Sequence, residues 1–145
     1  MKHLSTYNLS RELGPRFSNS FIELYSYDGS LEEDRIQVSK AIKTLMPEDK
    51  HGVTSFEEWG IMSRPTIKIF VDINDNLYRA FITVPHEISH AVGTGVLLRA
   101  AEFKMREIYP GCEELALLTG AITCRFQSAY MKETGLVVKE TKNES

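Results

Sequence analysis

Two long amphipathic stretches in the second half of the sequence most strongly constrain what this chain can fold into. From Cys112 to about Thr134, apolar residues recur every three or four positions, as in a helix with one buried face; they are Leu115, Leu118, Ile122, Phe126 and Ala129. Gly135 follows, where helices commonly end. A second helix is predicted from Pro85 to Ile108, because Tyr109-Pro110-Gly111 then breaks the chain. We expect both helices to bury an apolar face.

Strand patterns precede these helices. Residues 21–27 read FIELYSY, a β-branched and aromatic run that is typical of a strand. Residues 66–73, TIKIFVDI, and residues 77–84, LYRAFITV, alternate in polarity on either side of Asn74-Asp75-Asn76. This arrangement predicts a β-hairpin with a tight polar turn.

Two capping signatures predict shorter helices. Ser30 with Glu33 three residues later predicts a helix that runs to about Leu45, and Thr54 with Glu57 predicts a short helix through Trp59. Taken together, the patterns predict an α+β fold. In it, a small sheet with a β-hairpin packs against a long central helix and a C-terminal helix.

The length of the chain favours one domain. It has 145 residues, 42% of them apolar, which suffices for one well-packed core. We expect a single α+β domain over residues 1–138. The polar residues 139–145, KETKNES, cannot bury enough surface to become ordered and are expected to form a mobile tail.

Charge and hydropathy argue against several classes of protein. The net charge is −3, the isoelectric point is near 5.8, and the basic residues are scattered, so we expect no nucleic-acid partner. No apolar run has the length of a membrane span, and the N-terminus lacks the apolar segment of a signal peptide. We therefore expect a cytoplasmic protein without a membrane partner. Cys112 and Cys124 lack metal-site spacing and are expected to be free thiols.

The most specific chemical signal is H-E-x-x-H, formed by His86, Glu87 and His90. Histidines four residues apart lie one helical turn apart, which is the separation that one tetrahedral Zn²⁺ ion requires. The glutamate between them can accept a proton from a zinc-bound water. A helical wheel gives the histidines a shared face that is predicted to point inward, with Gly93, Leu97, Ala100 and Ala101.

A catalytic zinc site needs a third protein ligand. The metzincin extension H-E-x-x-H-x-x-G-x-x-H does not supply it, because Gly93 matches but Val96 stands where the last histidine would be. The next predicted helix offers two carboxylates in its first turn, Glu113 and Glu114. Glu114 is the better candidate, because it lies nearer the predicted buried stripe of that helix.

HEISHAVGTG, residues 86–95, followed by EELALLTGAI, residues 113–122, resembles the metallopeptidase domains of the IrrE/ImmA and ArdC-like zincins. The resemblance covers roughly residues 66–130 and depends on these two motifs. It implies zinc as the cofactor, His86 and His90 as ligands, Glu87 as the general base, and Glu114 or Glu113 as the third ligand. The implied function is a metal-dependent hydrolase, a peptidase-like zincin that uses a zinc-bound water on a peptide or protein substrate.

Pro85 supports a different interpretation. Proline suits the first turn of a helix, so His86 would lie at a helix start directly after a strand. Glu87 would then only complement the helix dipole, and His86 and His90 would belong to the core or to an interface. This alternative is a non-catalytic binding or regulatory module that takes a protein partner, a small ligand or a second copy of the chain in a homo-oligomer.

Overall fold

The computed structural model describes residues 1–56, 59 and 66–136. Within them, one sheet has the strand order β1-β2-β4-β3, with β1 at Lys2–Asn8, β2 at Phe21–Tyr27, β4 at Thr66–Asp72 and β3 at Gly52–Ser55. The central strands β2 and β4 are parallel, and each edge strand is antiparallel to its neighbour. A mixed sheet with helices packed against it confirms the predicted α+β class.

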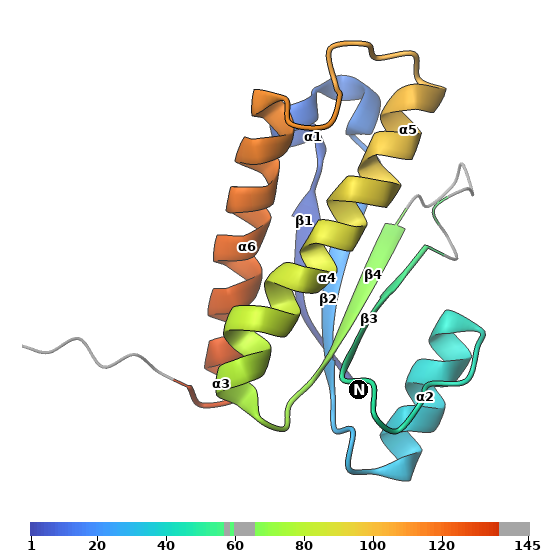
Figure 1. Ribbon diagram of the computed structural model, residues 1–145, viewed down its shortest axis with the longest axis vertical. Coiled ribbons are helices and arrows are strands. Elements are labelled where there is room, and N and C mark those ends of the chain that lie inside the picture. The colour runs from blue at the N-terminus through green and yellow to red at the C-terminus, as the bar shows by residue number, and fades with distance from the viewer. Residues whose placement is uncertain (57–58, 60–65, 137–145) are drawn as a thin grey trace, which may run out of the picture.

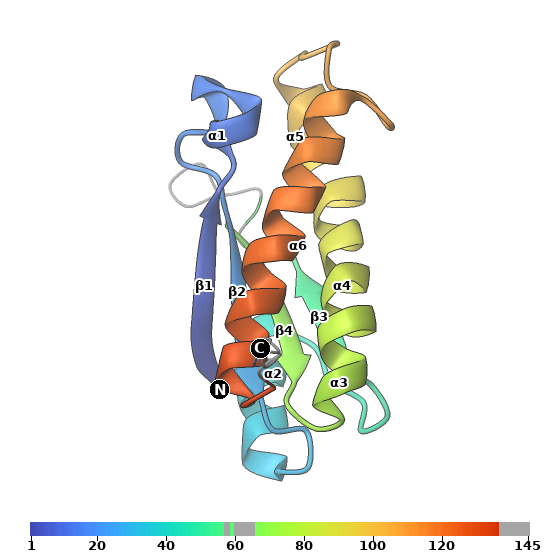
Figure 2. The ribbon, with the colours of Figure 1, turned by 90° about the vertical axis from the view of Figure 1, so that its left-hand side faces the viewer.

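A single long helix lies along one face of the sheet. The helices α3 (Asn76–Tyr78), α4 (Val84–His90) and α5 (Leu97–Glu102) are joined by the π-helical turns η2 (Arg79–Thr83) and η3 (Ala91–Val96). We call this continuous run of helix the central helix (Figure 1). Beside it, α6 (Glu113–Glu133) returns in the opposite direction (Figures 1 and 2).

Successive side chains of β4 point to opposite faces of the sheet and contribute to two separate hydrophobic clusters. Ile67 and Ile69 are fully buried in the larger cluster, on the face covered by the central helix and α6. Phe70 belongs to a smaller cluster on the opposite face, where α2 (Glu32–Ile42) contributes Val38. The remaining helices, α1 (Ser10–Leu13) and the 3-10 turn η1 (Pro15–Phe17), connect β1 to β2.

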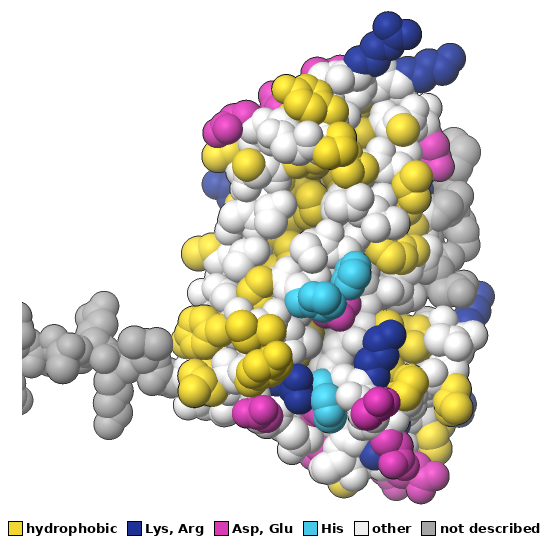
Figure 3. Space-filling model, in the orientation of Figure 1, with side chains coloured by type: hydrophobic (Ala, Val, Ile, Leu, Met, Phe, Trp, Pro, Cys, Tyr) yellow, Lys and Arg dark blue, Asp and Glu magenta, His cyan; other side chains and the backbone are white. Residues whose placement is uncertain are grey.

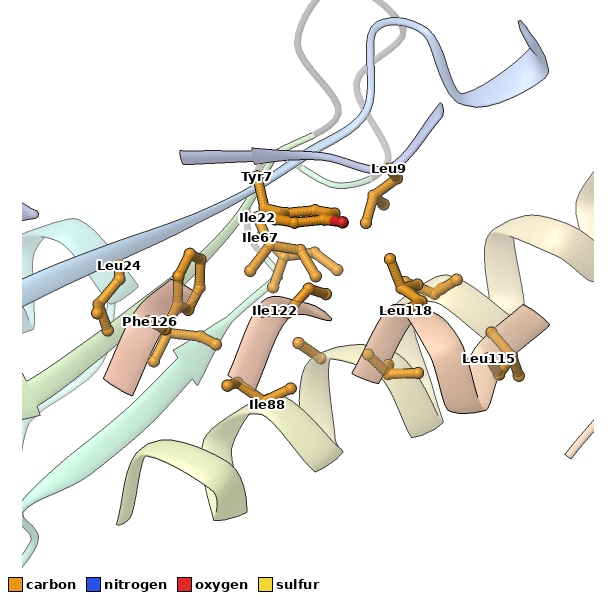
Figure 4. Close-up of a cluster of buried hydrophobic side chains, with 14 of the residues drawn as sticks. Tyr7, Leu9, Ile22, Leu24, Ile67, Ile88, Leu115, Leu118, Ile122 and Phe126 are labelled. Carbon is orange, nitrogen blue, oxygen red and sulfur yellow. The ribbon is translucent and has the colours of Figure 1, made fainter. Parts of the chain in front are cut away.

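The C-terminal helix packs as its sequence predicts. Leu118, Ile122 and Phe126 of α6 are fully buried and face the sheet and Ile88 of α4 (Figure 4). Since each such side chain contributes roughly 1.5–3 kcal/mol when it leaves water, this layer is a major source of stability.

The predicted β-hairpin is wrong in its second half. Residues 66–72 form β4, but residues 77–84 are helical. Their β-branched and aromatic composition favours a strand locally, yet Ala80 and Val84 are buried one turn apart, whereas Phe81 and Ile82 are exposed. Tertiary burial with a helical period therefore overrides local propensity here.

The central helix also begins earlier than predicted, at Asn76, so Pro85 lies inside it. A proline within a helix lacks an N–H group, and its ring crowds the carbonyl group four residues before it, here that of Phe81. The wider π-helical turn η2 lies directly before Val84-Pro85 and gives the ring room. The helix ends at Glu102 rather than Ile108.

Other predicted elements need smaller changes. The first predicted helix is shorter, at Glu32–Ile42, and the last is confirmed at Glu113–Glu133. The short helix expected from Thr54 is replaced at its start by β3, and Glu57 lies outside the described residues. Sequence analysis missed β1 altogether. The predicted tail, residues 139–145, also lies outside the described part of the chain.

Two general expectations can be compared with the structure. Both cysteines are free thiols, with Cys112 buried and Cys124 exposed. Within the described ranges, no helix combines the length and the apolar character that crossing a membrane requires.

Two adjacent leucines of α6 provide a test of this packing. Leu118 is fully buried and Leu117 is 58% exposed. We predict that Leu118→Ala lowers the free energy of unfolding by about 2 to 5 kcal/mol, because it leaves a cavity in the core. Leu117→Ala, the matched control, should change it by no more than ~0.5 kcal/mol. Urea unfolding measures both; equal losses would contradict the orientation of α6.

Candidate metal centre

The two histidines of H-E-x-x-H converge on the surface of α4. Their Nε2 atoms are 3.1 Å apart, and their ring centroids are 4.6 Å apart. Two nitrogens that bind one tetrahedral zinc at about 2.0–2.1 Å lie roughly 3.3 Å apart, so this separation is close to that of a shared ion. Both side chains are exposed. Figure 3 shows histidine side chains at the middle of the face that it presents.

The carboxylate of Glu87 lies beside this pair but is itself 5% exposed. The Thr54 hydroxyl in β3 donates to Glu87 Oε2 at 2.6 Å. His86, Glu87 and His90 each offer one ligand atom, and these atoms lie within 4.8 Å of one another. The three residues could therefore hold a metal ion, and two imidazoles with a carboxylate suit a transition metal.

Close approach of β3 to the central helix fixes the position of Glu87. A Cβ atom at Gly52 would lie 2.5 Å from Thr83 Cγ2 and 3.3 Å from Glu87 Cγ. A residue with a Cβ atom at this position would force the Thr83 side chain to move, so glycine fits this approach. The glycine thus brings the neighbouring Thr54 within hydrogen-bonding distance of the carboxylate.

The prediction that the histidine face points inward is wrong. The buried face of α4 is formed by Val84, Glu87 and Ile88, whereas His86 and His90 are exposed. Of the residues that the wheel placed with the histidines, Gly93 and Ala101 are also exposed, and Ala100 is fully buried. Buried positions recur every four residues from Val84 to Ala100, and each histidine lies two residues from them, on the opposite side of the helix.

The structure does not bring the predicted third ligand, Glu114 or Glu113, to the two histidines. Glu113 and Glu114 are exposed in the first turn of α6 and do not belong to the described cluster that could hold an ion. The central helix continues from His90 to Glu102 before the chain turns back (Figure 1). At 1.5 Å per residue, this separates the histidines from the start of α6 by roughly 18 Å. No described glutamate or aspartate other than Glu87 joins the two imidazoles.

A second polar network, missed by sequence analysis, lies at the C-terminal end of β4. Asp72 is 1% exposed, and it accepts hydrogen bonds from the backbone N–H groups of Gly29 and Asn74 and from the Asn74 amide. His51 Nδ1 lies 2.8 Å from Asp72 Oδ2. Sequence analysis placed Asp72 near the end of a predicted strand and gave it no role in a site, and the available signal for the pair was a histidine just before a strand.

The electrostatics of this network favour an ionised Asp72. Burial alone would raise the pKa of the Asp72 carboxyl group. The hydrogen bonds donated by Asn74, Gly29 and His51 outweigh burial and hold the pKa below its usual value of 3.8. The glycine is required for this contact, because a Cβ atom at Gly29 would lie 2.3 Å from Asp72 Oδ2.

Two hollows flank Glu87, so a molecule from solvent can reach the cluster. One, of about 380 Å³, is lined by Thr54, Phe56 and His90 among others. The other, of about 330 Å³, extends from Glu87 to His51. Both include His86 and Glu87 in their lining, whereas His90 lines only the first.

The sequence was compared with protein-family models, curated proteins and solved structures, and none of them matches it. The case for a function therefore depends on the arrangement of its own residues.

The network around Asp72 predicts a pH dependence of stability. A carboxyl group whose pKa is lower in the folded state stabilises the fold above its unfolded pKa, and this contribution is lost as the pH falls through the folded value. We predict that unfolding free energy decreases below about pH 5, and that Asp72→Asn makes this decrease shallower while lowering stability at neutral pH. Urea unfolding from pH 7 to 3 measures both effects. An unchanged slope in the variant would show that Asp72 is not the group that titrates.

Proposed function

We propose that this protein is a metal-dependent hydrolase that binds zinc through His86 and His90 and acts on peptides. The observation that carries the proposal is the convergence of the two Nε2 atoms, 3.1 Å apart, with the carboxylate of Glu87 within 4.8 Å. An exposed pair of imidazoles beside a buried carboxylate supplies two zinc ligands and a base for metal-assisted hydrolysis, and a third protein ligand is not found among the described residues.

The donor set favours zinc over the harder cations. Imidazole nitrogen suits Zn²⁺ and similar transition metals, whereas Mg²⁺ and Ca²⁺ prefer an all-oxygen shell. Neither Nδ1 atom of the pair has a hydrogen-bond partner among the described residues. Because such partners strengthen metal binding by orienting the ring, we expect an affinity below that of fully supported zinc sites.

Glu87 has the position of a general base. A bound Zn²⁺ would lower the pKa of a coordinated water toward neutrality. Glu87 can accept a proton through Oε1, because Thr54 already engages Oε2. Hydrolysis adds one water across a peptide bond: the carbonyl carbon gains hydroxide, the C–N bond breaks, and the proton passes to the departing nitrogen.

One observation supports the alternative, a non-catalytic binding module. The start of the central helix exposes Leu77, Tyr78, Phe81 and Ile82. These residues recur at helical spacing and form an apolar patch on the surface (Figure 3). Such patches are common at binding sites. The exposed histidines do not fit the core role that this alternative gave them, although an interface role stays open to them.

Metal content tests the proposal directly. The untagged protein, dialysed against zinc and then against metal-free buffer, should retain about one Zn²⁺ per chain by mass spectrometry. His86→Ala and His90→Ala should each abolish retention, because one imidazole cannot hold the ion. His3→Ala, which changes an exposed histidine outside the cluster, is the matched control and should retain it.

The role of Glu87 is separable from metal binding. Glu87→Gln should retain zinc but lower hydrolysis of fluorescein-labelled casein by roughly 10² or more, as loss of a positioned base does. A protein that takes up no zinc would refute the proposal. A zinc-loaded protein that hydrolyses casein equally well with Gln at this position would refute the role of Glu87.

A further inference from the structure

The hollow between Glu87 and His51 carries polar groups that the proposed hydrolysis does not use. We call it the His51 hollow; its lining includes Lys50, His51, Tyr78, Arg79, Ile82 and His86. One end holds the imidazole of the candidate metal centre, and the other holds an imidazole fixed by Asp72. A volume of about 330 Å³ is small for a pocket and suits one amino-acid residue.

Hydrogen-bond donors are in surplus at the His51 end. Lys50 forms no ion pair with a described residue. The guanidinium group of Arg79 contacts two neutral oxygens, the Asn74 carbonyl and the Thr83 hydroxyl, both at 3.3 Å, and no described carboxylate. Five N–H donors in a planar group leave others free for a ligand. The carboxylates of Asp49 and Glu87 also line the hollow, and Glu87 already accepts a hydrogen bond from Thr54.

The orientation of His51 is built into the fold. Its Nδ1 contacts Asp72, and the Asp72 carboxylate is held by backbone N–H groups in the buried network. With Nδ1–H donated to Asp72, the other nitrogen, Nε2, is left for the hollow. When protonated, His51 donates through both nitrogens, so Nε2 can bind an oxygen of a ligand there.

Apolar side chains complete the lining. Tyr78 and Ile82 are 52% and 51% exposed, and both line the His51 hollow. They belong to the exposed apolar residues of the central helix and share this lining with His86 of the candidate metal centre. A ligand in this hollow would thus contact His86 of the candidate metal centre, two apolar side chains and a group of hydrogen-bond donors.

We propose that the His51 hollow binds the C-terminal residue of a peptide, with its carboxylate on Arg79, Lys50 and His51 and its apolar side chain on Tyr78 and Ile82. The last peptide bond would then lie near His86 and Glu87, and hydrolysis would release a free apolar amino acid. The release depends on the proposed hydrolase function, whereas carboxylate binding in this hollow does not. The assigned substrate class is therefore a peptide with a free, apolar C-terminal residue.

The test uses the metal-free, full-length protein and two probes that differ only in charge. N-acetyl-leucine should bind roughly fivefold to tenfold more tightly than N-acetyl-leucinamide in an NMR titration, and should shift the His51 ring resonances. Arg79→Gln and Lys50→Gln should each reduce this preference to about twofold or less. Lys40→Gln, an exposed lysine on α2, is the matched control and should not change it.

A third probe, acetate, and the variant of an exposed residue, Lys50→Gln, complete the test. Acetate should bind at least roughly fivefold more weakly than N-acetyl-leucine, because it has no side chain for the apolar wall. Equal binding of the acid and the amide, no binding of either, or acetate binding as tightly as N-acetyl-leucine would overturn the assignment. Because Lys50 is exposed, Lys50→Gln keeps the test available if Arg79→Gln unfolds. A failure to retain zinc would refute the hydrolase proposal. It would not affect these binding measurements, because they use the metal-free protein.

Discussion

The contact between the edge strand β3 and the central helix is the constraint on which the candidate site depends. Gly52 lets the strand approach Thr83 and Glu87, and the Thr54 hydroxyl then donates to the Glu87 carboxylate. Without this contact Glu87 would be a solvated acid on a helix. With it, the carboxylate is buried and directed toward the imidazoles of His86 and His90, which remain open to solvent. Gly52 thus links the packing of β3 on the central helix to the position of the Glu87 carboxylate beside the two histidines.

Two polar units with different degrees of support lie along this contact. Asp72 is buried with a full set of hydrogen bonds, and it orients His51. The imidazoles of His86 and His90 lack such partners among the described residues. A bound ion would fix the orientation of the His86 and His90 rings, because both would coordinate it at once. The site that we propose is therefore completed by its ligand, whereas the Asp72 network is complete in the protein alone.

The sequence predicted those features that depend on short, regular patterns. The buried stripe of α6, the strand at Phe21–Tyr27 and the pairing of His86 with His90 all follow from a fixed period of side chains. Its failures came where the period changes or where distant residues meet. The predicted hairpin is wrong because tertiary burial with a helical period overrides the strand propensity of residues 77–84. The inward histidine face is wrong because His86 and His90 lie on the side of α4 opposite its buried residues. His51 with Asp72, and Thr54 with Glu87, are contacts between separate segments, which a single sequence does not reveal.

The most direct test of the central claim is the coordination of zinc in the loaded protein, measured by X-ray absorption at the zinc edge. We expect nitrogen and oxygen neighbours at about 2.0–2.1 Å, with the outer-shell scattering of two imidazole rings, and no retained zinc in His90→Ala. A sulfur neighbour at about 2.3 Å would instead indicate a cysteine thiolate such as that of the exposed Cys124. A spectrum with sulfur or without imidazole scattering would contradict the claim that His86 and His90 bind the ion together.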